Sequence, residues 1–302
     1  MYERILVPLD GSELAQIAIP YAEKLAGRLG SRITLLYVSS STEDRYQHMH
    51  QFYLQKMVEA TNQAAERYIE SPGAKAVKVE ATILAGDPAE EIVDYADKED
   101  FGLIIMSTHG RSGIRRWAMG SVADKVLRAT NQPLALIRAK HANTDVPDYK
   151  LLNKTLVTLD GSKQSEVVIP YIEELASRLK AEVILLQVVA PDYHIYTGGS
   201  QEYGIYSEQQ MESVKASSRD YLEEIVARLK QKGIAAQSEV RLGTAADEII
   251  KFADAIDVSI VAMSTHGRSG VSRWALGSVA ERVLRAGNTP LLLVRSPGTG
   301  TE

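Results

Sequence analysis

Two copies of one glycine-containing stretch are the part of this sequence whose residue types are best suited to hold a phosphate. In the first copy an apolar run ends in Met106-Ser-Thr-His-Gly110, and Gly120-Ser121 follows after nine intervening residues, where a helical pattern begins. Gly110 lets the backbone approach a ligand closely. A helix that begins at Ser121 directs free N–H groups and its positive dipole end toward an anion. The stretch therefore predicts an anion site.

The same stretch also admits a purely structural interpretation. Ser121 can cap the helix, with Asp124 completing a capping box, and Ser278 and Glu281 repeat this pair in the second copy. His109 is the only candidate base beside the expected phosphates, and it can instead be a hydrogen-bonding residue that fixes the loop. We expect the second of these roles for His109.

The interval between the two glycines carries arginines and one tryptophan per copy. The arginines can neutralise a triphosphate, although surface solubility explains them equally well, and we expect the tryptophans to pack rather than to stack on a base. These residues are Arg111, Arg115, Arg116 and Trp117 in the first copy and Arg268, Arg273 and Trp274 in the second.

The repetition extends beyond this stretch. Leu103–Arg138 and Ile260–Arg295 share 24 of 36 residues at an offset of 157, and Ile5–Ser12 matches Thr155–Ser162 at an offset of 150. The chain is therefore a tandem duplication. Because the two offsets differ by 7, we expect an insertion in the divergent middle of the second copy.

The positions of the elements follow from the apolar periodicity. Short apolar runs alternate with helical patterns, which predicts parallel strands joined by crossover helices. Asp87 and Thr244 are typical helix caps. We expect an α/β fold of two tandem, doubly wound, five-stranded parallel sheets. The strands expected in the first copy are Arg4–Leu9, Arg32–Val38, Val77–Leu84, Leu103–Ser107 and Pro133–Ile137.

Three of these strands should bring functional residues to one edge of the sheet. Asp10 follows the first strand, Val38 ends the second, and Met106 ends the fourth before the glycine loop. Doubly wound sheets bind ligands at the carboxyl ends of their strands, near the point where the strand order reverses. A carboxylate opposite a phosphate loop suits a ribose or base at one end and phosphates at the other. Asp10 can also be a plain turn or cap residue, and its recurrence as Asp160 does not separate the two interpretations.

Length and composition limit the number of domains and the classes of partner and chemistry that the chain allows. At 302 residues the chain is long enough for two ordinary domains, which we place at 1–140 and 151–302 with a polar linker at 141–150. A net charge of −5 gives no global field for nucleic acid or an anionic membrane, and no apolar run is long enough for a membrane helix. The absence of cysteine excludes disulfides and thiolate chemistry. We expect a cytoplasmic protein.

Two segments resemble each other least, and we expect both to be long irregular excursions. They span 39–60 and 190–213, and either a functional lid or a variable surface loop explains them. His48 and His50 lie in the first, but no third ligand has a suitable spacing, so we predict no metal site there.

These motifs resemble the universal stress protein family, whose ATP-binding members carry Gly-x-x-Gly-x₉-Gly-Ser/Thr after the fourth strand and an aspartate after the first. The resemblance covers both halves and implies a Rossmann-like fold similar to that of the adenine nucleotide alpha hydrolases. It implies ATP as the ligand, with Mg²⁺ arriving on the nucleotide. Asp10 and Val38 would contact the adenosine part, and the loop residues would surround the phosphates or ribose. The expected cofactor-binding residues are Pro8, Asp10, Val38, Met106, Ser107, His109, Gly110, Gly120, Ser121 and Val122 in the first copy, and Asp160, Val188, Met263, Ser264, His266, Gly267, Gly277, Ser278 and Val279 in the second.

The sequence departs from the family pattern in two places. Ser107 and Ser264 replace its opening glycine, so in both copies a side chain occupies a position where the stricter pattern leaves room for the ligand. Pro8 of the first copy becomes Thr158 in the second, which changes the ribose side of the site, so we expect two sites that are not equivalent. The resemblance also implies pairing through the last strands, Pro133–Ile137 and Pro290–Val294, which would create an internal pseudo-twofold dimer able to dimerise again.

The function expected from these observations is an ATP-binding stress or regulatory protein with little or slow hydrolysis and no assigned catalytic residue. One alternative is an ATP hydrolase or adenylate-forming enzyme in which His109 or His266 acts on phosphate or water. Another is an interaction module that is independent of nucleotide or selective for cyclic AMP. The adenine nucleotide is the expected small-molecule partner.

Overall fold

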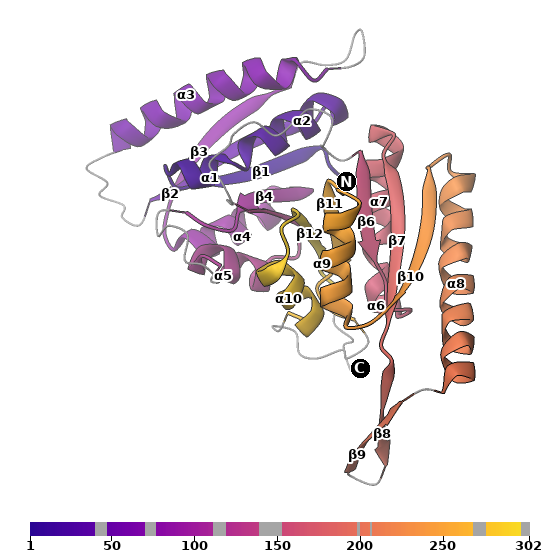
Figure 1. Ribbon diagram of the computed structural model, residues 1–302. Helices are drawn as coiled ribbons and strands as arrows, with labels where there is room; N and C mark the ends of the chain where they lie inside the picture. Colours follow the sequence, from indigo (N-terminus) through magenta and orange to yellow (C-terminus); the bar gives the residue numbers. More distant parts are fainter. Residues whose placement is uncertain are drawn as a thin grey trace.

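The computed structural model describes residues 1–39, 47–69, 77–110, 119–138, 153–197, 200–205, 207–267 and 276–296 (Figure 1). The expected linker at 141–150, and every arginine and tryptophan of the two glycine loops that was named above, lie outside these residues. Among the described residues no helix has both the length and the apolar character needed to span a membrane.

The first half forms a five-stranded parallel sheet in the order β3-β2-β1-β4-β5. All five expected strands are present, and their ends differ from the expected ones by two residues at most. The elements are β1 (Arg4–Leu9), α1 (Glu13–Gln16), α2 (Ile19–Leu29), β2 (Arg32–Ser39), α3 (Gln47–Glu66), β3 (Val79–Ala85), α4 (Pro88–Lys98), β4 (Leu103–Ser107), α5 (Ser121–Ala129) and β5 (Leu134–Ile137).

The second half repeats this order as β10-β7-β6-β11-β12 and adds one hairpin, β8-β9. Arg32 begins β2 and Glu182 begins β7, 150 residues later, whereas Val79 begins β3 and Ala236 begins β10, 157 residues later. The expected insertion is therefore confirmed. The elements are β6 (Lys154–Thr158), α6 (Lys163–Glu166), α7 (Ile169–Leu179), β7 (Glu182–Val189), β8 (Asp192–Thr197), β9 (Ser200–Ile205), α8 (Glu208–Gln231), β10 (Ala236–Leu242), α9 (Ala245–Ala255), β11 (Ile260–Ser264), α10 (Ser278–Ala286) and β12 (Leu291–Val294).

The expectation of long irregular excursions is wrong for much of both segments. Most of 39–60 belongs to α3, and 190–213 contains the β8-β9 hairpin and the start of α8. In Figure 1 the hairpin projects away from the large sheet. A capping box starts α8, because Ser207 accepts from the backbone of Gln210 and the Gln210 side chain accepts from the backbone of Ser207.

The two sheets join through their last strands. β12 pairs with β5 in antiparallel orientation, with Leu292 opposite Ala135, and the result is one ten-stranded sheet. The expected pairing is confirmed. Because parallel strands within each half end at the same edge and the two halves run in opposite directions, their carboxyl edges lie on opposite sides of the joined sheet.

Arginines that follow the last strands tie each half to the other. Arg138, after β5, donates to the carbonyl of Leu284 in α10, and Arg295, after β12, donates to the carbonyls of Ala129 (3.0 Å) and Thr130 (3.1 Å) at the end of α5. Cations are favourable at the carboxyl ends of helices, where carbonyls lack helical partners.

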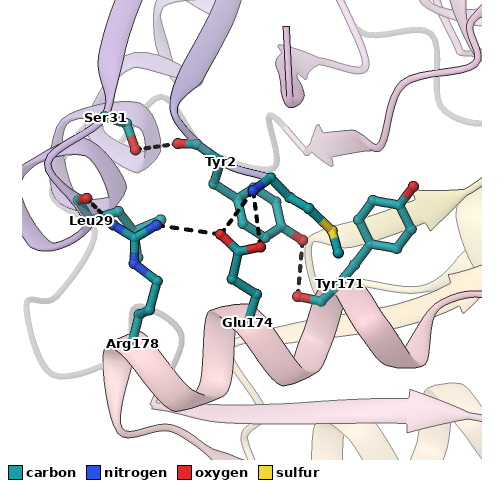
Figure 2. A network of polar contacts seen from close by, with 7 residues as sticks. Tyr2, Leu29, Ser31, Tyr171, Glu174 and Arg178 are labelled. Atoms are coloured by element: carbon teal, nitrogen blue, oxygen red, sulfur yellow. Dashed lines mark hydrogen bonds and ion pairs between the residues drawn. The ribbon is translucent and has the colours of Figure 1, made fainter.

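A second set of contacts joins the first two residues of the chain and α2 to α7 (Figure 2). The amino group of Met1 lies 3.0 Å from the Glu174 carboxylate, and the Tyr2 hydroxyl donates to the Tyr171 carbonyl over 3.1 Å. Arg178 bridges the halves in the other direction by donating to the carbonyl of Leu29. These contacts and the strand pairing hold the halves at two separate places.

Helices cover both faces of the sheet, as its apolar strands require. One core contains Val7 of β1 and Leu25 of α2, together with residues of α7 and α8. The other contains Leu6 of β1 and Ile92 of α4, together with residues of α9 and α10. Both cores therefore include residues of the two halves.

Glu23 of α2 is a partly buried carboxyl at the contact with α3. Burial raises the pKa of Glu23 to about 7, even though a hydrogen bond with Thr61 and the charges of Arg67 and Lys24 act to lower it. The folded protein therefore binds a proton at Glu23 more tightly than the unfolded chain does.

We predict a stability loss with rising pH that depends on Glu23. The stabilisation is complete below a pH of about 4.5, the unfolded value, and is lost as the pH rises through about 7. Glu23→Gln should remove this slope and raise the free energy of unfolding at pH 8 by about 1–2 kcal/mol, a figure discounted for partial solvent exposure. Urea denaturation from pH 4.5 to 8.5 measures it.

The matched control is Glu173→Gln, since Glu173 has the corresponding place in α7 but forms an ion pair with Lys232 over 2.6 Å. An identical pH slope in wild type and Glu23→Gln would contradict the prediction.

Candidate functional site

The residues expected to act together do meet at the carboxyl edge of each half. β1 and β4 are neighbours in the sheet, and the strand order reverses between them, because β2 lies on one side of β1 and β4 on the other. The tip of β1 and the loop after β4 thus face each other at the switch point. β6 and β11 have the same relation in the second half.

The closest contact in each site is between an aspartate and a glycine. A Cβ atom built on Gly110 would lie 2.2 Å from Oδ2 of Asp10, and one built on Gly267 would lie 2.3 Å from Oδ2 of Asp160. Real Cβ atoms do not approach an oxygen so closely. A side chain at either glycine would therefore displace the aspartate carboxylate, which occupies its place.

The aspartates also organise the turn after the first strand. Oδ1 of Asp10 accepts from the backbone N (2.9 Å) and Oγ (2.6 Å) of Ser12, which in turn caps α1. Asp160 binds Ser162 with the same distances. The turn interpretation and the site interpretation of these aspartates are therefore compatible with each other. In each of them Oδ1 accepts hydrogen bonds within the turn, whereas Oδ2 faces the glycine of the loop.

The second glycine of each loop fixes the start of a helix. The N–H of Gly120 donates to the carbonyl of Thr108 over 2.8 Å, and that of Gly277 donates to Thr265 over the same distance. Gly120 is the N-cap of α5, and no side chain caps this helix.

The capping boxes expected from Ser121 and Asp124, and from Ser278 and Glu281, are therefore wrong. Each serine is the first helical residue and not the cap, because the preceding glycine is held against the loop and supplies the first helical carbonyl to Asp124 or Glu281. By contrast, Asp87 caps α4 by accepting from Ala89 and Glu90, as expected.

His109 is positioned as a loop-fixing residue. Its Nδ1 lies 2.9 Å from Oγ1 of Thr108, and Nδ1 of His266 lies 2.9 Å from Oγ1 of Thr265. In both histidines Nε2 is enclosed and has no hydrogen-bond partner among the described residues. An enclosed nitrogen without a partner costs stability, which a ligand group could restore.

The serines that replace the opening glycine are buried and take part in the loop. Ser107 accepts from the backbone N–H of His109 over 3.2 Å, and Ser264 donates to the carbonyl of His266. Their hydroxyls thus stabilise the turn that precedes the glycine.

The second half contains a cavity of about 270 Å³ at this edge. Its walls are apolar toward β7 and α9 and polar toward the β11 loop and the start of α10. All nine residues expected in the second copy line it: Asp160, Val188, Met263, Ser264, His266, Gly267, Gly277, Ser278 and Val279.

Eight further lining residues were not expected. Most of them are apolar or directly follow an expected residue in the chain. The only sequence signals that could have indicated them are the comparison of the two copies and the alternation of side chains along a strand. They are Thr158, Leu159, Ser165, Leu186, Ala245, Ile249, Thr265 and Ala280.

In the first half, the expected residues lie at the corresponding positions. Pro8 and Met106 are buried on the tips of β1 and β4. Val38 and Val122 pack against the same core as Met106. Asp10 reaches Gly110, and Gly120 reaches the Thr108 carbonyl, so the structure brings the first-copy set together as well.

Ser165 supports the aspartate in the second half only. It accepts from the backbone N–H of Asp160 over 3.3 Å and donates to the carbonyl of Ser162 over 2.8 Å. The corresponding residue of the first half is Ala15.

The described residues contain no cluster of three or more metal-ligating side chains. His50, one of the two histidines considered for a metal, instead lies with Nε2 2.9 Å from the Tyr37 hydroxyl. The cavity offers a nucleotide an apolar wall, a glycine cradle and a helix N-terminus, and these features suit an organic phosphate.

Comparison with known proteins gives one consistent match. The model of the "Universal stress protein family" matches residues 1–138 and again 152–295. The chain is 24% identical to a universal stress protein of Synechocystis sp., over 97% of this chain and 100% of that protein. It is 27% identical to one of Methanocaldococcus jannaschii, over 47% of this chain and 98% of that protein.

A solved structure supports the fold. The crystal structure of a universal stress protein from Archaeoglobus fulgidus has a TM-score of 0.67 at 21% identity, over 98% of this chain and 100% of that one. At this identity the likeness shows the fold alone.

The contact between Asp160 and Gly267 predicts a specific coupling. Gly267→Ala should lower the free energy of unfolding by about 1–3 kcal/mol, because the methyl group displaces a packed carboxylate. In an Asp160→Ala background the same change should cost less than about 0.5 kcal/mol. Urea denaturation of the four proteins measures this, and equal costs in both backgrounds would contradict the contact.

Proposed function

Because the chain belongs to the universal stress protein family, we propose that each half binds one adenine nucleotide, ATP, and that the protein uses this binding in a regulatory or stress-response role with little or slow hydrolysis. The observation that carries the proposal is the cavity of the second half, which all nine residues expected there line.

The apolar end of this cavity suits the base. Val188, Ile249 and Met263 line it, and a planar base gains from contact with apolar side chains. Asp160 lies between this wall and the loop, where its carboxylate can accept hydrogen bonds from ribose hydroxyls.

The polar end suits the phosphates. The first residues of a helix have N–H groups without helical partners, and in α10 these residues are Ser278, Val279 and Ala280. All three line the cavity. The positive end of the helix dipole adds to their attraction for an anion, and Gly267 lets the loop approach without a side chain.

The described residues favour binding over turnover. His266 lines the cavity, but its Nδ1 already lies beside the Thr265 hydroxyl. Oδ1 of Asp160 already accepts two bonds from Ser162. Oδ1 of Asp160 is therefore not free to act as a general base, and Nε2 of His266 has no hydrogen-bond partner in the described part of the chain but is enclosed. Mg²⁺, when it arrives with the nucleotide, would supply charge neutralisation at the phosphates.

The fold makes the two sites separate. They lie at opposite edges of the joined sheet, so each nucleotide is bound by residues of one half. Each bound nucleotide would lie at the N-terminus of a helix whose other end is held by an arginine of the opposite half. Nucleotide binding at either site can thereby change the packing between the two halves.

We predict that nucleotide-stripped protein binds two ATP molecules per chain in isothermal titration calorimetry. The Gly120→Val, Gly277→Val double variant should bind none, because a side chain at either position meets the loop carbonyl, 3.3 Å and 3.1 Å from the Cβ position. Ala227→Val, on the exposed face of α8, is the control and should bind as wild type does.

Mass spectrometry of the purified proteins gives a second readout. An adenine nucleotide should accompany wild type and Ala227→Val but not the double variant. Absence of ATP and ADP binding to folded wild type would overturn the proposal, whereas exclusive binding of cyclic AMP would replace ATP with that ligand.

We predict turnover well below about 1 s⁻¹, the lower end of ordinary enzyme rates. His109→Gln and His266→Gln should leave the residual rate within about threefold, because neither imidazole is expected to act as a base. A steady-state phosphate-release assay measures this. Rates above about 1 s⁻¹ that collapse in either variant would instead assign the protein as an ATP hydrolase.

A further inference from the structure

The two sites differ at positions that form the apolar end of the cavity. Thr158 and Ala245 line the cavity of the second half. The corresponding residues of the first half are Pro8 and Pro88. The other apolar positions of this end are identical in both halves: Leu186, Val188, Ile249 and Met263 correspond to Leu36, Val38, Ile92 and Met106.

Thr158 brings a hydroxyl into a wall that is otherwise apolar. It ends β6, two residues beyond Leu156, whose side chain belongs to the core on the same face as the cavity. Its hydroxyl forms no hydrogen bond with another described residue, although the Thr158 side chain is buried. The hydroxyl is not one of the enclosed polar atoms without a partner, so it is open to the cavity, where a heteroatom of a nucleobase can form a hydrogen bond with it.

Ala245 leaves room at the opposite wall. It is the first residue of α9, directly after Thr244. In the first half the same helical position is Pro88, whose ring adds carbon atoms where Ala245 has only a methyl group. Pro88 thus adds bulk at this position of the first half, and Pro8 carries no hydroxyl where the second half has Thr158.

We propose that the second half holds the tighter nucleotide site, and that Thr158 and Ala245 determine this difference by hydrogen bonding to the base and by leaving it room. The inference rests on the proposed function, because it concerns the affinity of the same two sites. Ser165 accepts a hydrogen bond from the backbone of Asp160, whereas the first half has Ala15 at the corresponding position. This additional support of Asp160 also favours tighter binding in the second half.

The two halves provide substitutions that the fold accepts. Pro8 and Thr158 have equivalent ladder positions, opposite Leu36 and Leu186, so a proline is compatible with the strand at this point. Pro88 and Ala245 are both first residues of a helix, where proline lacks no needed N–H. Each exchange therefore places a residue at a backbone position where the other half already carries it.

Isothermal titration with ATP on the full chain tests the proposal one site at a time. Gly120→Val leaves only the second site, and Gly277→Val leaves only the first. We expect the Kd of the second site to be at least about tenfold lower, which corresponds to about 1.4 kcal/mol.

Exchanging the residues should then exchange the affinities. On the Gly120→Val background, Thr158→Pro with Ala245→Pro should raise the Kd to about that of the first site. On the Gly277→Val background, Pro8→Thr with Pro88→Ala should lower it. On the Gly120→Val background, Thr158→Val keeps the shape of the side chain and removes its hydroxyl. This variant should raise log Kd by about half as much as Thr158→Pro with Ala245→Pro does. Thermal unfolding confirms that each variant is folded.

The outcomes separate this inference from the proposed function. Equal affinities, a tighter first site, or exchanges that leave both Kd values unchanged would overturn the inference while leaving nucleotide binding intact. A folded wild-type chain that binds no adenine nucleotide at all would overturn both.

Discussion

β5 and β12 are apolar strands that would each be the exposed edge of a five-stranded sheet, and their antiparallel pairing removes both edges at once. The pairing turns two sheets into one and sets the two carboxyl edges on opposite sides. Arg138 and Arg295, which directly follow the paired strands, bind the carboxyl ends of the opposite half's helices. The chain thus contains its own pseudo-twofold partner, and each site is built within one half.

Within each half, one close contact links the two strand tips that make the site. The aspartate after the first strand lies where a Cβ of the loop glycine would be, so a larger residue there would displace the carboxylate from its contact with the loop. The same aspartate holds a serine cap with its other oxygen. The contacts that stabilise the turn after the first strand thus also place polar groups between the two strand tips, where we propose that the nucleotide binds.

Much of this could be predicted from the sequence, because strands buried on both faces are uninterrupted apolar runs and Asp87 is a strong cap. The family resemblance and the pairing of the last strands are confirmed. The capping box at Ser121 was wrong because a tertiary contact, Gly120 to Thr108, decides where α5 begins. The β8-β9 hairpin was missed although two glycines separate its strands in the sequence, a common hairpin signal. Ala245 and Ile249 reach the cavity only through the fold and carry no polar group that would indicate a site.

The most direct test of nucleotide binding at these strand tips is a crystal structure of the full chain grown with ATP and Mg²⁺. We predict electron density for a nucleotide at the carboxyl edge of the sheet, with its base against Val188 and Met263 and its phosphates at the N-terminus of α10. Density for the nucleotide at any other place, or an empty cavity at saturating ATP, would contradict this prediction.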